Sequence, residues 1–239
     1  MAYRDDLDLT ANKLDAYLDD VLQKRMPVVQ QQSMAVLADE LGIDELIQSG
    51  GLQGDRLAQF LDTYLNNAFH IQHPANMGHQ VSCPHPSGAI GGFVDAFTNN
   101  PMAIYEKGPA AATIEYALIN WMLGKVGWRP SPYPGDQAGG AAYGGGVLTH
   151  GGSLAQLTAL AAARSHADPD IWERGNNPDL VVIAPHDAHY SVSRALGILG
   201  MGQGALVSTP CDAQGSIVPD QLVETIENTK KRGKQLMAV

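Results

Sequence analysis

Residues 1–68 carry apolar positions that recur with the period of an α-helix. Pro27 and Ser49-Gly50-Gly51 interrupt the pattern and divide it into three stretches. The apolar positions of the three stretches are Leu14, Leu18, Val21 and Leu22, then Met34, Leu37 and Leu41, then Leu57, Phe60, Leu61, Tyr64 and Leu65. Each stretch has one apolar face that needs cover from another surface. We therefore expect a helical arm over residues 1–68.

Residues 109–239 show a different pattern, in which helical stretches alternate with short apolar runs. Strands are expected at 180–184, at 204–208 and from 235 onward, and helices at 153–165, 190–199 and 219–231. The buried face of the helix at 153–165 is expected to consist of Leu154, Leu157 and Ala161. Such alternation is typical of a mainly parallel sheet with crossover helices.

Residues 69–108 lie between these two regions and are rich in proline, glycine, histidine and asparagine. This composition predicts a long loop with a short helix around 92–98. Loops of this length in compact proteins are usually functional.

Composition and charge narrow the class of protein. The chain has 239 residues, 44% of them hydrophobic, with a net charge of -10 and a pI near 5.1. An acidic chain of this kind is not expected to bind nucleic acid or an anionic membrane. Two cysteines are too few for a disulfide framework, and no signal segment or long apolar span is evident. A cytoplasmic location is therefore expected.

A glycine-rich turn meets an alanine-rich helix between Gly144 and Arg164, which read GGGVLTHGGSLAQLTALAAAR. Gly151 and Gly152 let the backbone approach an anion closely, and Ser153 is expected to cap the helix and offer its hydroxyl. The spacing matches neither the P-loop nor the dinucleotide fingerprint. The turn is thus a candidate site for another phosphorylated cofactor, with an ordinary entry into a core helix as the alternative.

The apolar run Leu180–Ala184 ends at Pro185 and is followed by HDAHYS. His189 therefore falls just beyond the carboxyl end of a buried strand, at the edge where ligands bind in open α/β sheets. Its imidazole could stack on a flat heteroaromatic ring. The alternative is a helix-capping histidine that binds no ligand.

Four blocks of the chain together resemble the group II pyridoxal-phosphate-dependent amino acid decarboxylases, which have the aspartate aminotransferase fold. Two of the blocks are the glycine-rich turn with its helix and the sequence HDAHYSVSRALGILG that follows it. The other two lie upstream and read HPANMGHQVSCP and YEKGPAAATIEYALINWM. The resemblance runs from about residue 70 to the C-terminus. It implies an α/β fold in which residues 109–239 are the first half of a pyridoxal-phosphate-binding large domain, preceded by the helical arm and a substrate-side loop region at 69–108.

The resemblance also implies roles for individual residues. Gly152 and Ser153 would hold the phosphate of pyridoxal 5'-phosphate, and His189 would stack on its pyridine ring as a catalytic residue. Gln80 and Ser82 would line the substrate pocket, with a hydrogen-bonded loop as the alternative for both. No metal ligand is expected among the site residues.

For the whole protein, the resemblance implies a lyase that decarboxylates a small L-amino acid. Gln80-Val81-Ser82 favours a substrate of the glutamate, cysteine sulfinate or diaminobutyrate type over an aromatic one. The arm of this family packs across a partner subunit, so a homodimer is implied as well.

The family needs a Schiff-base lysine and an aspartate at the pyridine nitrogen, and both are expected beyond Val239. The chain has seven lysines, at 13, 24, 107, 125, 230, 231 and 234, none of which resembles the lysine motif of the family. We therefore expect these residues to be the N-terminal half of a longer enzyme, inactive alone, with an unpaired sheet edge.

Two other functions are compatible with the sequence. One is a non-catalytic cofactor-binding or assembly fragment. The other is a metal-binding module built from His70, His73, His79, Cys83 and His85, although their spacing matches no structural zinc pattern.

Overall fold

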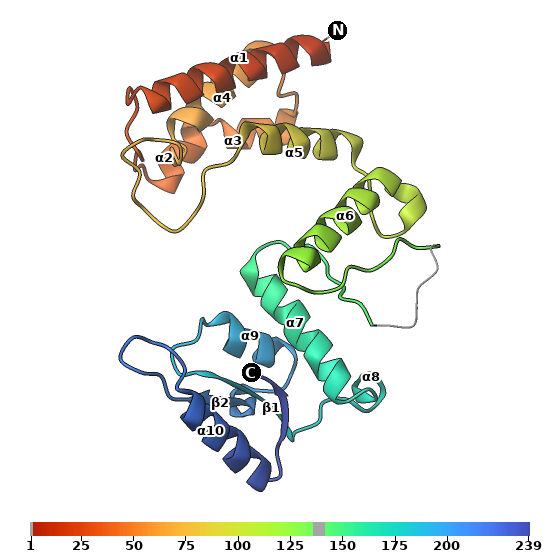
Figure 1. The fold of residues 1–239 in the computed structure, drawn as a ribbon. Helices are drawn as coiled ribbons and strands as arrows, with labels where there is room; N and C mark the ends of the chain where they lie inside the picture. The colour runs from red at the N-terminus through yellow and green to blue at the C-terminus, as the bar shows by residue number, and fades with distance from the viewer. Residues whose placement is uncertain (1, 136–141) are drawn as a thin grey trace. The chain divides into compact units, whose positions relative to one another are not determined.

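The structure is a computed structural model that describes residues 2–135 and 142–239. The chain divides into two compact units, Met1–Asn99 and Asn100–Val239, and each is described by itself (Figure 1). The division falls between Asn99 and Asn100, so the segment 69–108 contributes to both units.

The first unit is helical, as predicted for the arm. Its helices are α1 (Ala2–Leu22), α2 (Met34–Glu40), α3 (Ile43–Ser49), α4 (Gly54–Asn66) and α5 (Pro86–Thr98). The long helices α1 and α4 pack against each other (Figure 1). Val21 and Leu65 are buried, and Lys13 pairs with Asp62 at 2.6 Å. Pro27 lies between α1 and α2, and Gly50 and Gly51 follow Ser49, the last residue of α3, as expected from the missing amide of proline and the freedom of glycine.

The stretch between α4 and α5 is held down by His70. Its side chain is fully buried, and its two ring nitrogens contact the carbonyl oxygens of Pro27 and Leu65, the latter at 3.0 Å. The Cys83 thiol donates to the carbonyl of Ile71 at 3.3 Å and ties the end of the stretch to its beginning. The segment is therefore an anchored loop.

Helix α5 is longer than the sequence predicts. It begins at Pro86, in the first helical position, and Nδ1 of the preceding His85 accepts from the Ser87 amide at 3.2 Å. The predicted start at residue 92 was wrong because the three glycines of this helix masked its first turns, whereas the proline start signal was present in the sequence.

The second unit is an α/β structure. It contains η1 (Tyr105–Lys107), α6 (Pro109–Lys125), α7 (Gly152–Ala167), α8 (Ile171–Arg174), β1 (Leu180–Pro185), α9 (Ser191–Ile198), η2 (Gln203–Ala205), β2 (Leu206–Thr209), α10 (Pro219–Lys231) and β3 (Gln235–Ala238). The three strands form a parallel sheet in the order β2-β1-β3. The predicted α/β class, with a parallel sheet and crossover helices after an N-terminal helical region, is confirmed.

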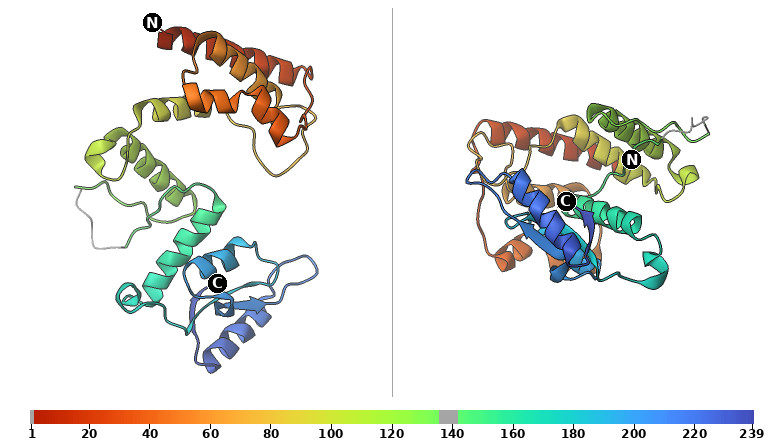
Figure 2. Two further views of the ribbon diagram at one scale, coloured as in Figure 1. Left: turned by 180° about the vertical axis from the view of Figure 1, so that it is seen from behind. Right: turned by 60° about the horizontal axis from the view of Figure 1, so that its bottom comes forward.

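The sheet is covered on both faces. Strand β1 lies between β2 and β3, and its apolar residues are almost fully buried, as a central parallel strand requires. Right-handed crossovers from β1 to β2 and from β2 to β3 run in opposite directions along the sheet, so α9 and α10 cover opposite faces (Figure 1 and Figure 2). The core beside α7 and α9 is formed by Leu160, Val182, Ala195, Leu196 and Ala205.

The buried face of α7 differs from the expected one. Leu160 is buried and Leu157 packs against the core, but Leu154 is 45% exposed. Leu154 lies in the first turn of the helix, which extends past the core. In the described ranges 2–135 and 142–239, no helix combines the length and hydropathy needed to cross a bilayer.

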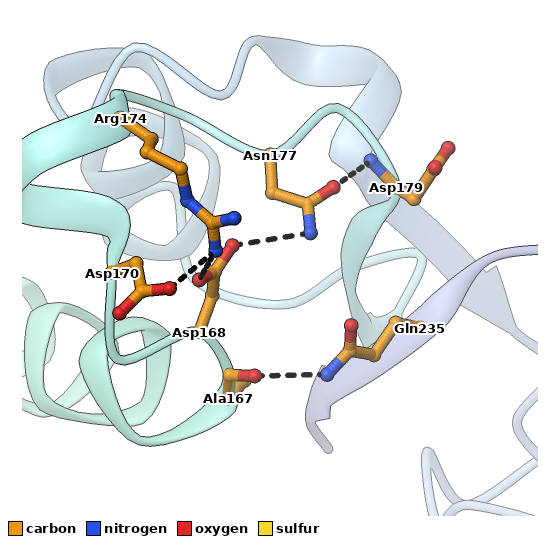
Figure 3. A network of polar contacts seen from close by, with 7 residues as sticks. All are labelled: Ala167, Asp168, Asp170, Arg174, Asn177, Asp179 and Gln235. Carbon is orange, nitrogen blue, oxygen red and sulfur yellow. Dashed lines mark hydrogen bonds and ion pairs between the residues drawn. The ribbon is translucent and has the colours of Figure 1, made fainter.

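A polar network connects the end of α7 to the beginning of the sheet (Figure 3). Arg174 pairs with Asp168 at 3.3 Å and with Asp170 at 2.9 Å, and Asn177 donates to Asp168 at 3.2 Å. Gln235, the first residue of β3, donates to the carbonyl of Ala167 at 3.0 Å. The C-terminus of α7 therefore lies at the edge of the sheet where the parallel strands begin.

Candidate functional site

The glycine-rich turn approaches α6 closely before it reaches α7. The Gly144 amide donates to the Arg129 carbonyl at 2.9 Å, and a Cβ on Gly144 would lie 2.8 Å from Leu123 Cδ2. The Leu148 amide donates to Glu115 Oε1 at 2.9 Å. The stretch that leads into α7 is thereby fixed against α6, and a side chain at Gly144 would press against the Leu123 side chain.

The first amides of α7 are unpaired donors. The N-cap is Gly151, with φ of 82°, and its carbonyl accepts from the Ala155 amide at 3.2 Å. Throughout the described part of the chain, the amides of Gly152, Ser153 and Leu154 have no hydrogen-bond acceptor. The helix therefore presents three N–H groups and the positive end of its dipole.

Ser153 is not the cap that the sequence suggested. It lies inside the first turn, and no side chain caps the helix. The left-handed φ of Gly151 explains the difference, because glycine adopts this conformation without a Cβ penalty and begins the helix two residues earlier. The Ser153 hydroxyl is consequently beside the unpaired amides, and its side chain is exposed.

His189 lies between β1 and α9, directly before the N-cap Tyr190. Its Nδ1 lies 3.2 Å from the Ser191 amide nitrogen and 2.9 Å from the Ser191 hydroxyl oxygen. An amide N–H can only donate, so Nδ1 is an acceptor and the proton of the neutral ring is on Nε2. The exposed imidazole is therefore held in one orientation by the buried Ser191.

The ring of Tyr190 contacts the imidazole of His189. The ring centroids of His189 and Tyr190 are 4.1 Å apart with planes tilted by 36°, and the Arg194 guanidinium lies 4.4 Å from the centroid of Tyr190. This row of aromatic and cationic groups further limits rotation of His189.

The topology brings the two predicted cofactor elements to the same sheet edge. Arg164 near the end of α7 donates to the Leu199 carbonyl at the end of α9, at 3.0 Å. Because Gln235 holds the end of α7 at the edge where the strands begin, the N-termini of α7 and α9 both point toward the edge where the strands end. The unpaired amides and His189 are therefore at the carboxyl edge of the sheet, where open α/β proteins bind ligands.

The residues present fit pyridoxal phosphate. A phosphate dianion needs several donors at a helix N-terminus, which α7 offers. A Cβ on Gly151 or Gly152 would meet no other heavy atom within 4 Å, so the space before the turn is open. An exposed and oriented imidazole suits contact with a flat ring.

Gln80 and Ser82 belong to the first unit. Both are exposed, in the anchored loop between α4 and α5. Because each unit is described by itself, their role in substrate binding stays a prediction.

Three of the four histidines of the suggested metal module, His70, His73 and His85, have other partners. His70 faces two carbonyl oxygens, and Nδ1 of His73 accepts from the Ala75 amide at 3.0 Å. Nδ1 of His85 accepts from Ser87. Across residues 2–135 and 142–239, the one group of three side chains placed as metal ligands lies elsewhere, at His186, Asp187 and Cys211.

Sequence reasoning missed this group and also the orienting role of Ser191. Cys211 follows β2 and lies beside the residues that follow β1. Burial raises the pKa of the Cys211 thiol, and the carboxylates of Asp187 and Asp212 raise it further. The sequence does show that His186, Asp187 and Cys211 each follow the end of a strand. That these two strand ends lie side by side, however, is known only from the strand register.

Known proteins resemble this chain in sequence. It is 27% identical over 199 residues to the L-2,4-diaminobutyrate decarboxylase of Acinetobacter baumannii, covering 77% of this chain and 36% of that protein. It is 23% identical over 193 residues to the cysteine sulfinic acid decarboxylase of Rattus norvegicus, covering 80% of this chain and 36% of that protein. The chain thus spans about a third of the length of these curated relatives.

The fold is also shared with a solved structure. The crystal structure of mouse CSAD superposes with a TM-score of 0.79 at 22% identity, over 96% of this chain and 47% of that chain. In addition, the family model described as the pyridoxal-dependent decarboxylase conserved domain matches residues 55–239. Because that match covers most of the chain, the chain belongs to the pyridoxal-dependent decarboxylase family.

Proposed function

We propose that this chain supplies the phosphate- and ring-binding part of a pyridoxal-phosphate-dependent L-amino acid decarboxylase. The observation that carries the proposal is the set of unpaired amides at Gly152, Ser153 and Leu154, on the same sheet edge as the oriented His189. Family membership over residues 55–239 supports the same function.

Each of these groups has a defined task. The amides and the Ser153 hydroxyl bind the phosphate, and the dipole of α7 adds to the attraction. His189 contacts the cofactor ring, and the Ser191 amide keeps the imidazole proton on Nε2, away from the protein. Bound pyridoxal phosphate supplies an electron-withdrawing ring that accepts the electron pair left when carbon dioxide departs.

We further propose an acidic or amino-substituted substrate, with Gln80 and Ser82 in its pocket. The relatives named above act on diaminobutyrate and cysteine sulfinate according to their names. The loop that carries both residues is anchored by His70 and by the Cys83 thiol. An anchored loop holds polar side chains in place at a small entropic cost.

A homodimer and a cytoplasmic location complete the proposal. In the first unit, an apolar groove of about 370 Å³ is lined by α1 and α5, including Leu7, Leu14, Ile90 and Phe93. Phe93 is 46% exposed and Ile90 is 65% exposed, so this face suits burial against a partner subunit. The free thiols of Cys83 and Cys211 agree with a reducing compartment.

Cofactor binding is tested with 4-deoxypyridoxine 5'-phosphate, an analogue that lacks the aldehyde. It cannot form an imine with any of the seven lysines, so it measures the phosphate and ring contacts alone. We expect saturable binding of this analogue by the chain, measured by calorimetry, and much weaker binding of unphosphorylated deoxypyridoxine. Equal affinity for both compounds would contradict the phosphate site.

Two serine variants sharpen the test. Ser153→Ala removes one hydrogen bond to a charged group, worth about 1.5 to 3 kcal/mol, or roughly 10- to 150-fold in affinity. Ser87→Ala is the matched control, because Ser87 holds the same second position in α5 in the first unit. Only Ser153→Ala should weaken binding; an equal loss in both variants would indicate a general effect on folding.

Activity is tested in the full-length protein that carries this chain, by release of labelled carbon dioxide from a panel of L-amino acids. Glutamate, cysteine sulfinate and diaminobutyrate should be turned over faster than tryptophan or tyrosine. His189→Ala should reduce turnover strongly while far-ultraviolet circular dichroism stays unchanged. Unchanged turnover would refute the role of His189, and preferred turnover of an aromatic substrate would refute the proposed substrate class.

A further inference from the structure

A group of three potential metal ligands lies where β1 and β2 end. The register pairs Pro185 of β1 with Thr209 of β2, so the two parallel strands leave the sheet side by side. His186 and Asp187 follow Pro185 directly, and Cys211 follows Thr209 by two residues. The ligand atoms of His186, Asp187 and Cys211 lie within 4.8 Å of one another.

The backbone around these three residues is held by hydrogen bonds. The Ala188 amide donates to the Pro185 carbonyl at 3.1 Å and closes the turn that carries His186 and Asp187. Cys211 forms an antiparallel bridge with Ile217. The ligands therefore project from two defined turns that the sheet register places together.

Asp212 shapes the second turn. Its Oδ1 accepts from the amides of Gln214 at 2.9 Å and Ser216 at 2.8 Å, and its amide donates to the Ser216 carbonyl at 2.9 Å. This carboxylate oxygen is occupied within its own loop. Asp187 is thus the carboxylate of the group.

The chemistry of the three side chains selects the ion. An imidazole, a thiolate and a carboxylate are together the ligand types of zinc, whereas calcium and magnesium take oxygen ligands. At zinc bond lengths, ligand atoms in a tetrahedron are about 3.5 Å apart. His186 and Asp187 are exposed and Cys211 is partly buried, so small side-chain rotations close the remaining gap.

We propose that His186, Asp187 and Cys211 form a zinc-type binding site at the carboxyl edge of the sheet. Three protein ligands leave the fourth tetrahedral position to water or to another donor. None of the three ligands is a group assigned to the cofactor. The nearby His189 is not a fourth ligand through Nδ1, because that atom is paired with Ser191. It stands independently of the proposed decarboxylase function.

The test is cobalt(II) titration of the reduced chain in a buffer without pyridoxal phosphate. Tetrahedral cobalt bound to a thiolate gives visible d–d bands and a near-ultraviolet charge-transfer band. We expect both bands to saturate at one equivalent and to disappear on addition of zinc. Absence of the charge-transfer band at saturating cobalt would overturn the proposal.

Variants identify the ligands. Cys211→Ser should abolish the charge-transfer band, and His186→Ala and Asp187→Asn should each lower the affinity at least tenfold. Cys83→Ser is the matched control, because it removes the other thiol of the chain and should leave the titration unchanged. A band that survives Cys211→Ser, or is lost in Cys83→Ser, would overturn the proposal.

A measurement on the unmodified chain guards against variants that do not fold. Zinc should slow alkylation of Cys211 by iodoacetamide at least tenfold, as followed by peptide mass spectrometry, while Cys83 in the same sample keeps its rate. Equal alkylation of Cys211 with and without zinc would refute binding at this site.

Discussion

Replacement of His70 by alanine is expected to destabilise the first unit selectively. The imidazole is fully buried, contacts the carbonyls of Pro27 and Leu65, and packs edge-on against Tyr17 with ring centroids 5.5 Å apart. It therefore joins α1, the segment after α1 and the end of α4. The His70→Ala change removes all three contacts at once.

The expected loss follows from these contacts. An imidazole with one N–H donates one hydrogen bond to these carbonyls, worth about 1 kcal/mol net, and a carbonyl left buried without a partner costs about 1 to 3 kcal/mol. The aromatic contact adds about 0.5 to 1.5 kcal/mol. We expect the free energy of unfolding of the first unit to fall by about 3 to 5 kcal/mol, which is a large part of the stability of an ordinary domain.

The chain allows both units to be followed in one urea titration. Its three tryptophans, Trp121, Trp128 and Trp172, all belong to the second unit, so tryptophan fluorescence reports that unit alone. Far-ultraviolet circular dichroism also reports the helical first unit. His70→Ala should move the circular dichroism transition to lower urea and leave the fluorescence transition in place.

His85→Ala serves as the control within the same unit. His85 is exposed and only caps α5, so its loss should cost about 1 kcal/mol. Equal shifts for the two variants, or a loss below 1 kcal/mol for His70→Ala, would refute the reasoning. Such a result would return His70 to the list of available metal ligands.

Three further predictions concern other contacts. Burial raises the pKa of Tyr17, with a further contribution from Tyr64. As the pH rises, the unfolded chain therefore loses the phenol proton before the folded chain does, and the stability of the first unit should fall above about pH 10. Tyr17→Phe should reduce that fall in alkaline urea titrations. Gly151→Ala should destabilise the second unit by about 1 to 2 kcal/mol, because the φ angle of Gly151 is 82°. Gly152→Ala should not destabilise it, because the space around Gly152 is open. Equal losses in the two variants would contradict the assignment of Gly151 as the N-cap. Arg164→Ala removes the bond to the Leu199 carbonyl and should lower the free energy of unfolding of the second unit, followed by tryptophan fluorescence, by about 1.5 to 3 kcal/mol, with no effect on the first unit.

Periodicity predicted the regular elements of the second unit well. The strand at 180–184 and the helices at 153–165, 190–199 and 219–231 correspond to β1, α7, α9 and α10 within about two residues at each end. Local signals were sufficient there because strong apolar patterns coincide with proline and glycine boundaries. Where glycines diluted the helical pattern, as in α5, the predicted start was wrong.

The site was predictable only in part. The residue types at Gly152, Ser153 and His189 indicated a ligand edge, but the cap at Gly151 depends on a backbone angle that the sequence does not reveal. The cluster that includes Cys211 depends on the pairing of Pro185 with Thr209, two positions far apart in the chain. Long-range register must be known before such a cluster can be recognised.

The central claim is that unpaired amides at the start of α7 hold a phosphate while His189 contacts the attached ring. The most direct measurement is an amide nitrogen–proton correlation spectrum of the isotopically labelled chain during titration with 4-deoxypyridoxine 5'-phosphate. We predict that the amide signals of Gly152, Ser153 and Leu154 shift downfield and that the ring protons of His189, followed in an aromatic carbon–proton correlation spectrum of the same sample, shift upfield, all with one dissociation constant. Saturation without any shift at these three amides, or with shifts confined to other helix N-termini, would contradict the account.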